Sequence, residues 1–83
     1  MKITVKYFAS VREQITRGQE EVETSATDLN ALREELIARG EPYAQALSLG
    51  KAIRMALNQQ VCAGDAVLQA GAEVAFFPPV TGG

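Results

Sequence analysis

Apolar and polar side chains alternate at the start of the chain, and this pattern predicts an N-terminal β-hairpin. Residues 2–8 carry apolar side chains at every second position: Ile3, Val5 and Tyr7. A period of two places such a set on one face of a sheet. Residues 20–24 predict a second, weaker strand, reached through a polar turn at 16–19. Its acidic side chains are expected to be solvated at the strand edge: Glu20, Glu21 and Glu23.

Three further strands are predicted in the second half of the chain. Residues 53–57 alternate again and end at a predicted turn, Asn58-Gln59-Gln60. Residues 61–62 are expected to form a short edge strand after that turn. The last strand covers 73–77 and stops at Pro78-Pro79, because proline has no N–H to donate to a neighbouring strand.

One stretch between these strands has the period of an amphipathic helix. Its apolar residues recur at i, i+3, i+7 and i+8: Leu29, Leu32, Leu36 and Ile37. Thr27 is the expected N-cap, with the charge of Asp28 in the first turn. Gly40 and Pro42 are expected to end the helix. Residues 43–49 fit either a short second helix or an irregular connection.

The predicted order of elements is strand, strand, helix, strand, short strand, strand. A helix packed on one face of a mixed sheet is the economical α+β arrangement for a chain of 83 residues. This is the order of the β-grasp, or ubiquitin-like, fold. We therefore expect a β-grasp domain over residues 1–77 and an extended C-terminal tail over residues 78–83.

The charge and hydropathy of the chain argue against two classes of partner. The net charge is −2 and the eight Lys and Arg residues are spread along the chain, so no basic stripe for nucleic acid is present. No apolar run approaches the roughly 20 residues that span a bilayer. The first residues also lack the long apolar segment of a secretory signal. We expect a cytoplasmic protein that binds neither nucleic acid nor membrane.

The chain has few residues with catalytic chemistry. It has no His, and Cys62 is its only cysteine. An internal disulfide, a zinc site of Cys and His ligands and a Ser-His or Cys-His nucleophile pair are therefore excluded. Cys62 is expected to be a half-buried strand thiol rather than a persulfide or thioester site. Whether the isolated chain is an enzyme stays open, and we expect it to bind no metal and no cofactor.

Residues 78–83 have the properties of a segment that leaves the domain and enters a partner. Pro78-Pro79 fixes φ at about −65° and biases the preceding residue toward extended backbone. Val80-Thr81 is β-branched and also favours extended backbone. Gly82-Gly83 has no Cβ, so its backbone fits a channel too narrow for side chains.

The charge pattern near this tail points to chemistry at the terminal carboxylate. After Asp65 the only charged side chain is Glu73, so the carboxylate of Gly83 is an isolated anion on a neutral stalk. A partner that encloses it must supply Lys or Arg, because burying a lone carboxylate is costly. Adenylation by ATP would give this carboxylate a leaving group, and sulfur could then displace the adenylate to form a thiocarboxylate. The alternative is that Gly82-Gly83 is an ordinary frayed end, although such ends are usually polar.

Four segments of the chain resemble those of a known family. They are Tyr7–Glu13, with a Phe-Ala-x-x-Arg-Glu pattern, Leu29-x-x-Leu32-Arg33, Ala56-Leu57-Asn58-Gln59, and the terminal block Glu73–Gly83. In these segments the chain resembles the small subunit of molybdopterin synthase, a ubiquitin-like sulfur carrier. The terminal block, with Phe-Phe-Pro-Pro before Gly-Gly, is the specific one. One departure is Ala72, where the family usually has Asp, and we expect it to affect only the local turn.

The resemblance implies a sulfur-carrier function. An E1-like adenylating enzyme would activate Gly83 with ATP and Mg, and a sulfur donor protein would convert it to a thiocarboxylate. The carrier would then insert its tail into the large synthase subunit, in a heterotetramer of two small and two large subunits. Sulfur would pass to a cyclic pyranopterin precursor held by the large subunit and form the dithiolene of molybdopterin, a step of molybdenum cofactor biosynthesis. As the sulfur-donating subunit, the chain would be part of a sulfurtransferase enzyme.

Candidate partner contacts lie beside the tail. Phe76 and Phe77 are consecutive in a strand, so one faces the core and the other the opposite face of the sheet. The sequence leaves open which of them faces outward, where a Phe suits a partner anchor. Phe8 is out of phase with the apolar set of the first strand, which favours exposure. Arg12 is expected either to pair across an interface or to stay solvated.

Two other functions fit the same sequence. Another Gly-Gly carrier on this fold, in the thiamine pathway or as a ubiquitin-like protein modifier, would share the tail chemistry, although thiamine carriers usually lack the Phe-Phe-Pro-Pro block. A β-grasp adaptor would bind partners through its sheet without using Gly83. Deleting Gly83 distinguishes the carrier from the adaptor, and conjugates on lysines would identify a modifier.

Overall fold

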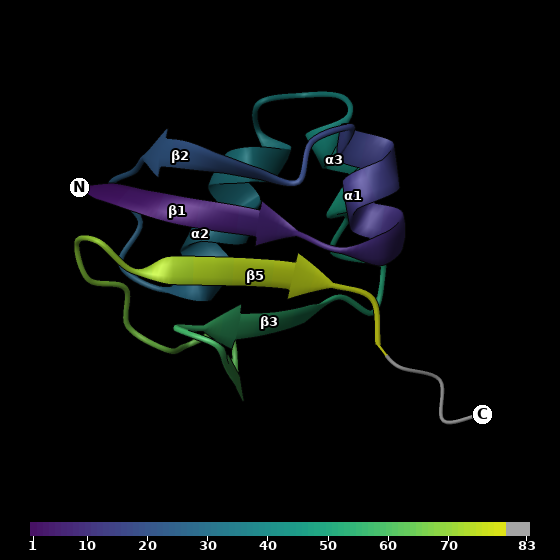
Figure 1. Cartoon of the computed structure of the whole chain (residues 1–83). Coiled ribbons are helices and arrows are strands. Elements are labelled where there is room, and N and C mark those ends of the chain that lie inside the picture. Colours follow the sequence, from purple (N-terminus) through teal and green to yellow (C-terminus); the bar gives the residue numbers. More distant parts are fainter. Residues whose placement is uncertain (80–83) are drawn as a thin grey trace.

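The computed structural model describes residues 1–79, which form a mixed sheet with helices packed on one face (Figure 1). In chain order the elements are β1 (Lys2–Tyr7), α1 (Ala9–Ile15), β2 (Gln19–Glu23), α2 (Leu29–Ile37), α3 (Tyr43–Ala46), β3 (Arg54–Leu57), β4 (Gln60–Cys62) and β5 (Glu73–Phe77). The predicted α+β β-grasp arrangement is confirmed. None of the helices within residues 1–79 is long and apolar enough to cross a membrane.

The last strand lies in the middle of the five-stranded sheet, whose order is β2-β1-β5-β3-β4. Strand β5 runs parallel to β1, with Tyr7 opposite Phe76, and antiparallel to β3, with Arg54 opposite Phe77. The end of β1, the end of β5 and the start of β3 therefore meet at one end of the sheet. The chain leaves the sheet at Pro78 from this end, where β1 and β3 flank β5 on its two sides.

The core between the sheet and α2 follows the two periods read from the sequence. Strand residues of the predicted apolar set are almost completely buried, and so are the leucines of the helix: Ile3, Val5, Tyr7, Leu29, Leu32 and Leu36. Phe76 joins them from β5 and stacks on Tyr7, with ring centroids 6.4 Å apart. Because Phe76 is part of this core, the position of β5 depends on the same packing that holds β1 and α2.

The predicted N-terminal hairpin is wrong in its connection, because α1 lies between β1 and β2. The two strands still pair antiparallel. Helix α1 buries only Val11 and Ile15, a single i, i+4 pair, which is too short a pattern to indicate a helix in the sequence. It ends at Thr16, which has φ of 66° and donates its backbone N–H to the Arg12 carbonyl, 2.8 Å away.

The predicted main helix is confirmed as α2, but its N-cap is Asp28 rather than Thr27. The Asp28 carboxylate accepts a hydrogen bond from the backbone N–H of Ala31 at 2.8 Å. Both residue types are good caps, so the sequence alone does not select between them. Gly40 follows the helix with φ of 92°, a conformation that suits glycine. Within residues 43–49, the short-helix alternative is correct and is α3.

The turn predicted after β3 is confirmed and fixes the start of β5. Asn58 and Gln59 have φ of 50° and 71°, as a two-residue hairpin turn requires. Asn58 donates its backbone N–H to the Glu73 carbonyl at 2.8 Å, and its side-chain oxygen accepts from the Glu73 N–H at 3.0 Å. This pair of bonds sets the register between β3 and the strand that carries the tail.

Candidate functional site

The candidate site is the point where the chain leaves the end of β5. Pro78 and Pro79 are half-buried at this point. Phe8 donates its backbone N–H to the Phe76 carbonyl at 3.1 Å, so the chain after β1 remains bonded to the chain before the tail. The predicted reactive and channel residues, Val80, Thr81, Gly82 and Gly83, lie outside the described residues. The extended tail over 78–83 therefore stays a prediction.

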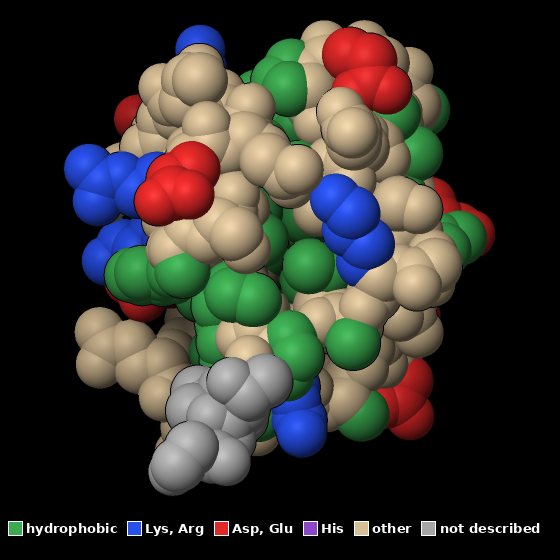
Figure 2. Space-filling model, turned by 90° about the vertical axis from the view of Figure 1, so that its right-hand side faces the viewer, with side chains coloured by type: hydrophobic (Ala, Val, Ile, Leu, Met, Phe, Trp, Pro, Cys, Tyr) green, Lys and Arg blue, Asp and Glu red, His purple; other side chains and the backbone are tan. Residues whose placement is uncertain are grey.

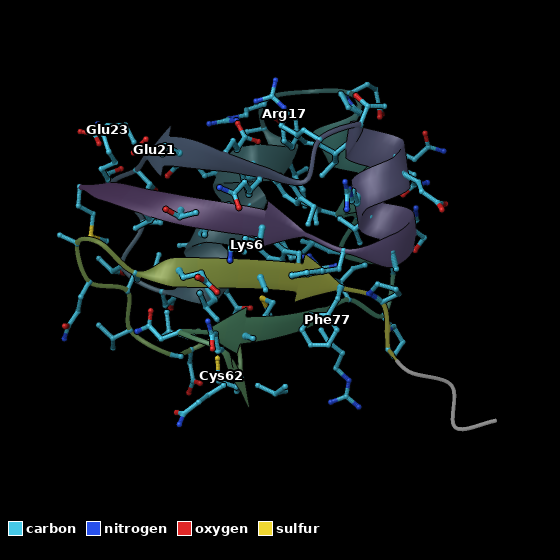
Figure 3. All side chains as sticks on the ribbon, viewed as in Figure 1. Lys6, Arg17, Glu21, Glu23, Cys62 and Phe77 are labelled. Carbon is cyan, nitrogen blue, oxygen red and sulfur yellow. The ribbon has the colours of Figure 1, made fainter. Side chains whose placement is uncertain are left out.

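The two consecutive phenylalanines face opposite sides of the sheet, as predicted. Phe76 is the inward one, with 0% of its surface exposed. It was expected among the partner contacts, and this expectation is wrong because a fully buried core ring is not accessible to a partner. Phe77 lies on the outer face, is half-buried, and sits where β5 ends and β3 begins (Figure 3).

Phe8 and Arg12 are both exposed, as the partner-contact expectation requires. Phe8 is 47% exposed, although it is a large apolar side chain. Arg12 lies one turn further along α1, and its guanidinium lies over the turn at Gly18, where an added Cβ would be 3.4 Å from Nε. Arg12 also lines a shallow surface hollow of about 620 Å³ together with Glu13 and Arg17. The structure thus brings Phe8, Phe77 and Arg12 to the same end of the molecule.

Val61 is a further exposed apolar residue that sequence reasoning missed. Val61 belongs to β4, is 64% exposed, and lies opposite Ala56 of β3. Ala56 in turn lies opposite Ala75 of β5, and both alanines are buried on the outer face of the sheet. We call the set Phe8, Phe77 and Val61 the exit surface. In the sequence, Val61 and Cys62 are neighbours in a predicted strand and must face opposite sides of the sheet. Only the strand register shows that Val61 is on the same side as Phe77.

Cys62 is half-buried, as predicted, and packs against the core from β4. It lies opposite Met55, whose side chain is part of the core. This position on the inner face separates the thiol from the exit surface on the outer face. Within residues 1–79, no group of three or more His, Cys, Asp or Glu side chains is arranged to hold a metal ion.

Glu20 was expected to be solvated, and this expectation is wrong. It lies opposite the buried Val5 and therefore faces the helices, with only 9% of its side chain exposed. Its carboxylate accepts hydrogen bonds from the hydroxyls of Tyr7 at 2.8 Å and Tyr43 at 2.6 Å. Two guanidinium groups also donate to it, those of Arg17 at 3.1 Å and Arg39 at 3.2 Å. Its neighbours Glu21 and Glu23 are exposed, as predicted.

The ionisation of this cluster follows from its contacts. Burial alone would raise the pKa of Glu20, but the hydrogen bonds from Tyr43, Tyr7 and Arg39 together outweigh it, so the pKa is lowered. Burial, and then the bond to Glu20, raises the pKa of Tyr7. A charged Glu20 thus holds a neutral Tyr7, and Tyr7 supports Phe76 directly behind the exit.

Arg33 of α2 supports the loop that precedes β3. Its side chain is buried, and it donates to the backbone carbonyls of Leu47 at 2.8 Å, Ser48 at 2.6 Å and Lys51 at 3.2 Å. Burial lowers the pKa of Arg33. These bonds fix the loop that leads into β3, and therefore the position of Arg54 beside Phe77.

Comparison with known proteins places this geometry in a family. Residues 5–83 match the ThiS family. The molybdopterin synthase sulfur carrier subunit of Escherichia coli is 43% identical over 98% of this chain and 99% of its own length. The protein with the same name from Haemophilus influenzae is 38% identical, again over 98% of this chain and 99% of its own length.

Solved structures agree with these relatives in fold. A putative molybdopterin converting factor subunit 1 from Pyrococcus furiosus has a TM-score of 0.77 and 27% identity, over 96% of this chain and 99% of that one. A chain in the complex of subunits 1 and 2 of the molybdopterin-converting factor from Helicobacter pylori has a TM-score of 0.67 and 26% identity, over the full length of both chains. The chain described here belongs to the ThiS family.

Proposed function

We propose that this chain is the sulfur carrier subunit of a molybdopterin synthase and that the carboxylate of Gly83 carries the sulfur. The observation that supports this best is the terminal block Glu73–Gly83, in a chain 43% identical over nearly its whole length to a carrier subunit of that name. The block begins as the central strand of the sheet, so its base is held by β1 on one side and β3 on the other.

The proposed chemistry takes place at the end of the tail. In an E1-like adenylating enzyme, a carboxylate oxygen of Gly83 attacks the α-phosphorus of ATP, and pyrophosphate leaves with Mg. A sulfur donor protein then supplies sulfur at the oxidation level of sulfide. This sulfur bonds to the carbonyl carbon while the C–O bond to AMP breaks and AMP leaves, so that a thiocarboxylate results with no change of oxidation state. The described part of the chain contributes no catalytic side chain to these steps. We propose that its role is to hold and present the tail. We also propose that the ATP-dependent steps take place in the cytoplasm.

In the second stage the loaded carrier binds the large synthase subunit. The solved Helicobacter pylori structure is a complex of subunits 1 and 2, and its chain similar to ours supports a large-subunit partner here. The exit surface, Phe8, Phe77 and Val61, would form the apolar centre of the contact, with Arg12 at its border. The tail would bring sulfur to a pyranopterin precursor in the large subunit, in a heterotetramer of two subunits of each kind.

A reconstituted synthase tests this proposal. Purified carrier, activating enzyme, ATP, sulfur source, large subunit and precursor are combined, and molybdopterin is measured as its fluorescent oxidation product. Deletion of Gly83 should abolish product while the variant still binds the large subunit. Product formation by the deletion variant would overturn the proposal. Sulfur transfer to a thiazole precursor alone would indicate a thiamine carrier, and carrier–lysine conjugates would indicate a protein modifier.

A further inference from the structure

The eight Lys and Arg side chains of this chain divide into three groups by their contacts. Four of them lie within 4.0 Å of a carboxylate: Lys2 with Glu21, Lys6 with Glu73, and both Arg17 and Arg39 with Glu20. Arg33 is buried on loop carbonyls. The remaining three, Arg12, Lys51 and Arg54, are exposed and have no carboxylate partner within residues 1–79.

All three of these cations lie around the exit of the tail. Arg54 is opposite Phe77 in the sheet, and Arg12 lies one turn after Phe8 in α1. Lys51 reaches α1, with its ammonium 3.4 Å from the side-chain oxygen of Gln14. Figure 2 views this end and shows Lys and Arg side chains around the apolar surface next to the C-terminal segment. Figure 2 also shows Asp and Glu side chains on this end, and Glu13 follows Arg12 in α1. The feature of the exit is therefore three cations that have no carboxylate partner within residues 1–79, in a chain of net charge −2.

We propose that the large synthase subunit receives the exit surface on an apolar seat bordered by carboxylates that face Arg12, Lys51 and Arg54. This inference rests on the proposed function and adds the chemistry of the partner surface. The tail itself ends in an anion and needs cations deep in its channel. The rim around the channel entrance has the opposite requirement, because three unpaired cations approach it. Phe8 and Phe77 lie next to two of these charges, Arg12 and Arg54, and apolar rings beside cations favour a protein surface over a polyanion.

Such an arrangement acts mainly on the rate of association. Exposed charges of opposite sign steer two proteins into register and raise the association rate by ten- to about a thousandfold, whereas they change dissociation less. The effect is screened when the Debye length falls from about 10 Å at 0.1 M salt to about 3 Å at 1 M. The salt dependence of association is therefore the direct signature of the acidic rim.

Stopped-flow association with the purified large subunit tests the rim. The variants are Lys51→Glu and Arg54→Glu, and the matched control is Lys2→Glu, which makes the same charge change at the other end of β1. At low salt we expect each exit variant to associate about five- to tenfold more slowly than wild type, and the control less than twofold. In about 1 M salt the three variants should converge with wild type.

Two outcomes overturn the inference, and they are distinguishable from failure of the proposed function. Equal slowing by Lys2→Glu and the exit variants would mean that only net charge matters. Exit variants that associate like wild type at every salt concentration would mean that no acidic rim exists. Absence of any complex between wild-type carrier and large subunit would instead refute the proposed function, and the rim with it. Thermal unfolding of each variant verifies that it is folded.

Discussion

Truncation of Phe8 to alanine separates the docking role of the exit surface from its role in the fold. Phe8 is 47% exposed, and it follows β1 directly beside the point where the tail leaves. A partner that covers the exit surface removes the exposed part of this ring from water. The alanine variant lacks that part, while the tail and the strands around it are unchanged. The large subunit should therefore bind the variant more weakly.

The size of the effect follows from the exposed area. A phenylalanine side chain buries about 150–250 Å² when fully covered, so the 47% still exposed corresponds to about 70–120 Å². At about 25 cal/mol per Å² this is about 2–3 kcal/mol, or an increase in Kd of about 30- to 150-fold. The part of the Phe8 ring that is already buried makes a similar contribution to folding, so the melting temperature of the variant also falls. A domain with the usual unfolding free energy, roughly 5 kcal/mol or more, remains folded after this loss.

Isothermal titration calorimetry at low temperature measures the Kd of wild type and variant for the large subunit. Val67→Ala is the control, since Val67 is 66% exposed but lies beside Asp28 at the start of α2, away from the exit. Its Kd should stay within about twofold of wild type, because surface substitutions outside a contact change little. Equal weakening by both variants, or an unchanged Kd for Phe8→Ala, would refute the assignment of the exit surface.

Three further predictions concern the supports behind that surface. Glu20→Ala leaves the buried hydroxyl of Tyr7 without its acceptor and should lower the unfolding free energy by about 1–3 kcal/mol in urea titrations. Folding lowers the pKa of Glu20 from 4.5, so the difference in unfolding free energy between variant and wild type should be full near neutral pH and shrink as the pH falls below about 4.5. A difference that stays constant down to acid pH would contradict this assignment. Arg33→Met should speed hydrogen exchange in the loop at 47–51, whose carbonyls lose their donor, and unchanged exchange would show that the loop does not depend on it. Phe76→Ala should cost about 3–5 kcal/mol of unfolding free energy, and Phe77→Ala clearly less; equal costs would contradict the assigned faces.

The elements predicted from the sequence are those whose own residues carry the signal. The strands at 2–8 and 73–77 and the helix around Leu32 bury a regular apolar set, and a regular period is enough to recognise them. Helix α1 was missed because its two buried residues span a single turn. The cap of α2 was misplaced by one residue because Thr27 and Asp28 are both suitable side chains.

The missed parts of the site depend on contacts between distant segments. Glu20 is buried because strand register places it opposite Val5 and beside Tyr7, and its other partners come from later parts of the chain. Arg33 donates hydrogen bonds to backbone carbonyls at least 14 residues further along the chain. Val61 belongs to the exit surface only through its row with Ala56 and Ala75. The alternation around Val22 indicates that Glu20 shares the inner face of the sheet with Val22. No local pattern identifies the partners of Glu20, because they come from other segments of the chain.

The tail chemistry connects the fold to the proposed function, and the mass of the intact carrier tests it most directly. Wild-type chain is incubated with the activating enzyme, ATP, Mg and a sulfur source, and its mass is measured before and after. We predict an increase equal to the replacement of one oxygen by one sulfur, located by fragmentation on Gly83 and absent without ATP. An unchanged mass, or added sulfur on Cys62 with Gly83 unmodified, would contradict the assignment of Gly83 as the sulfur carrier.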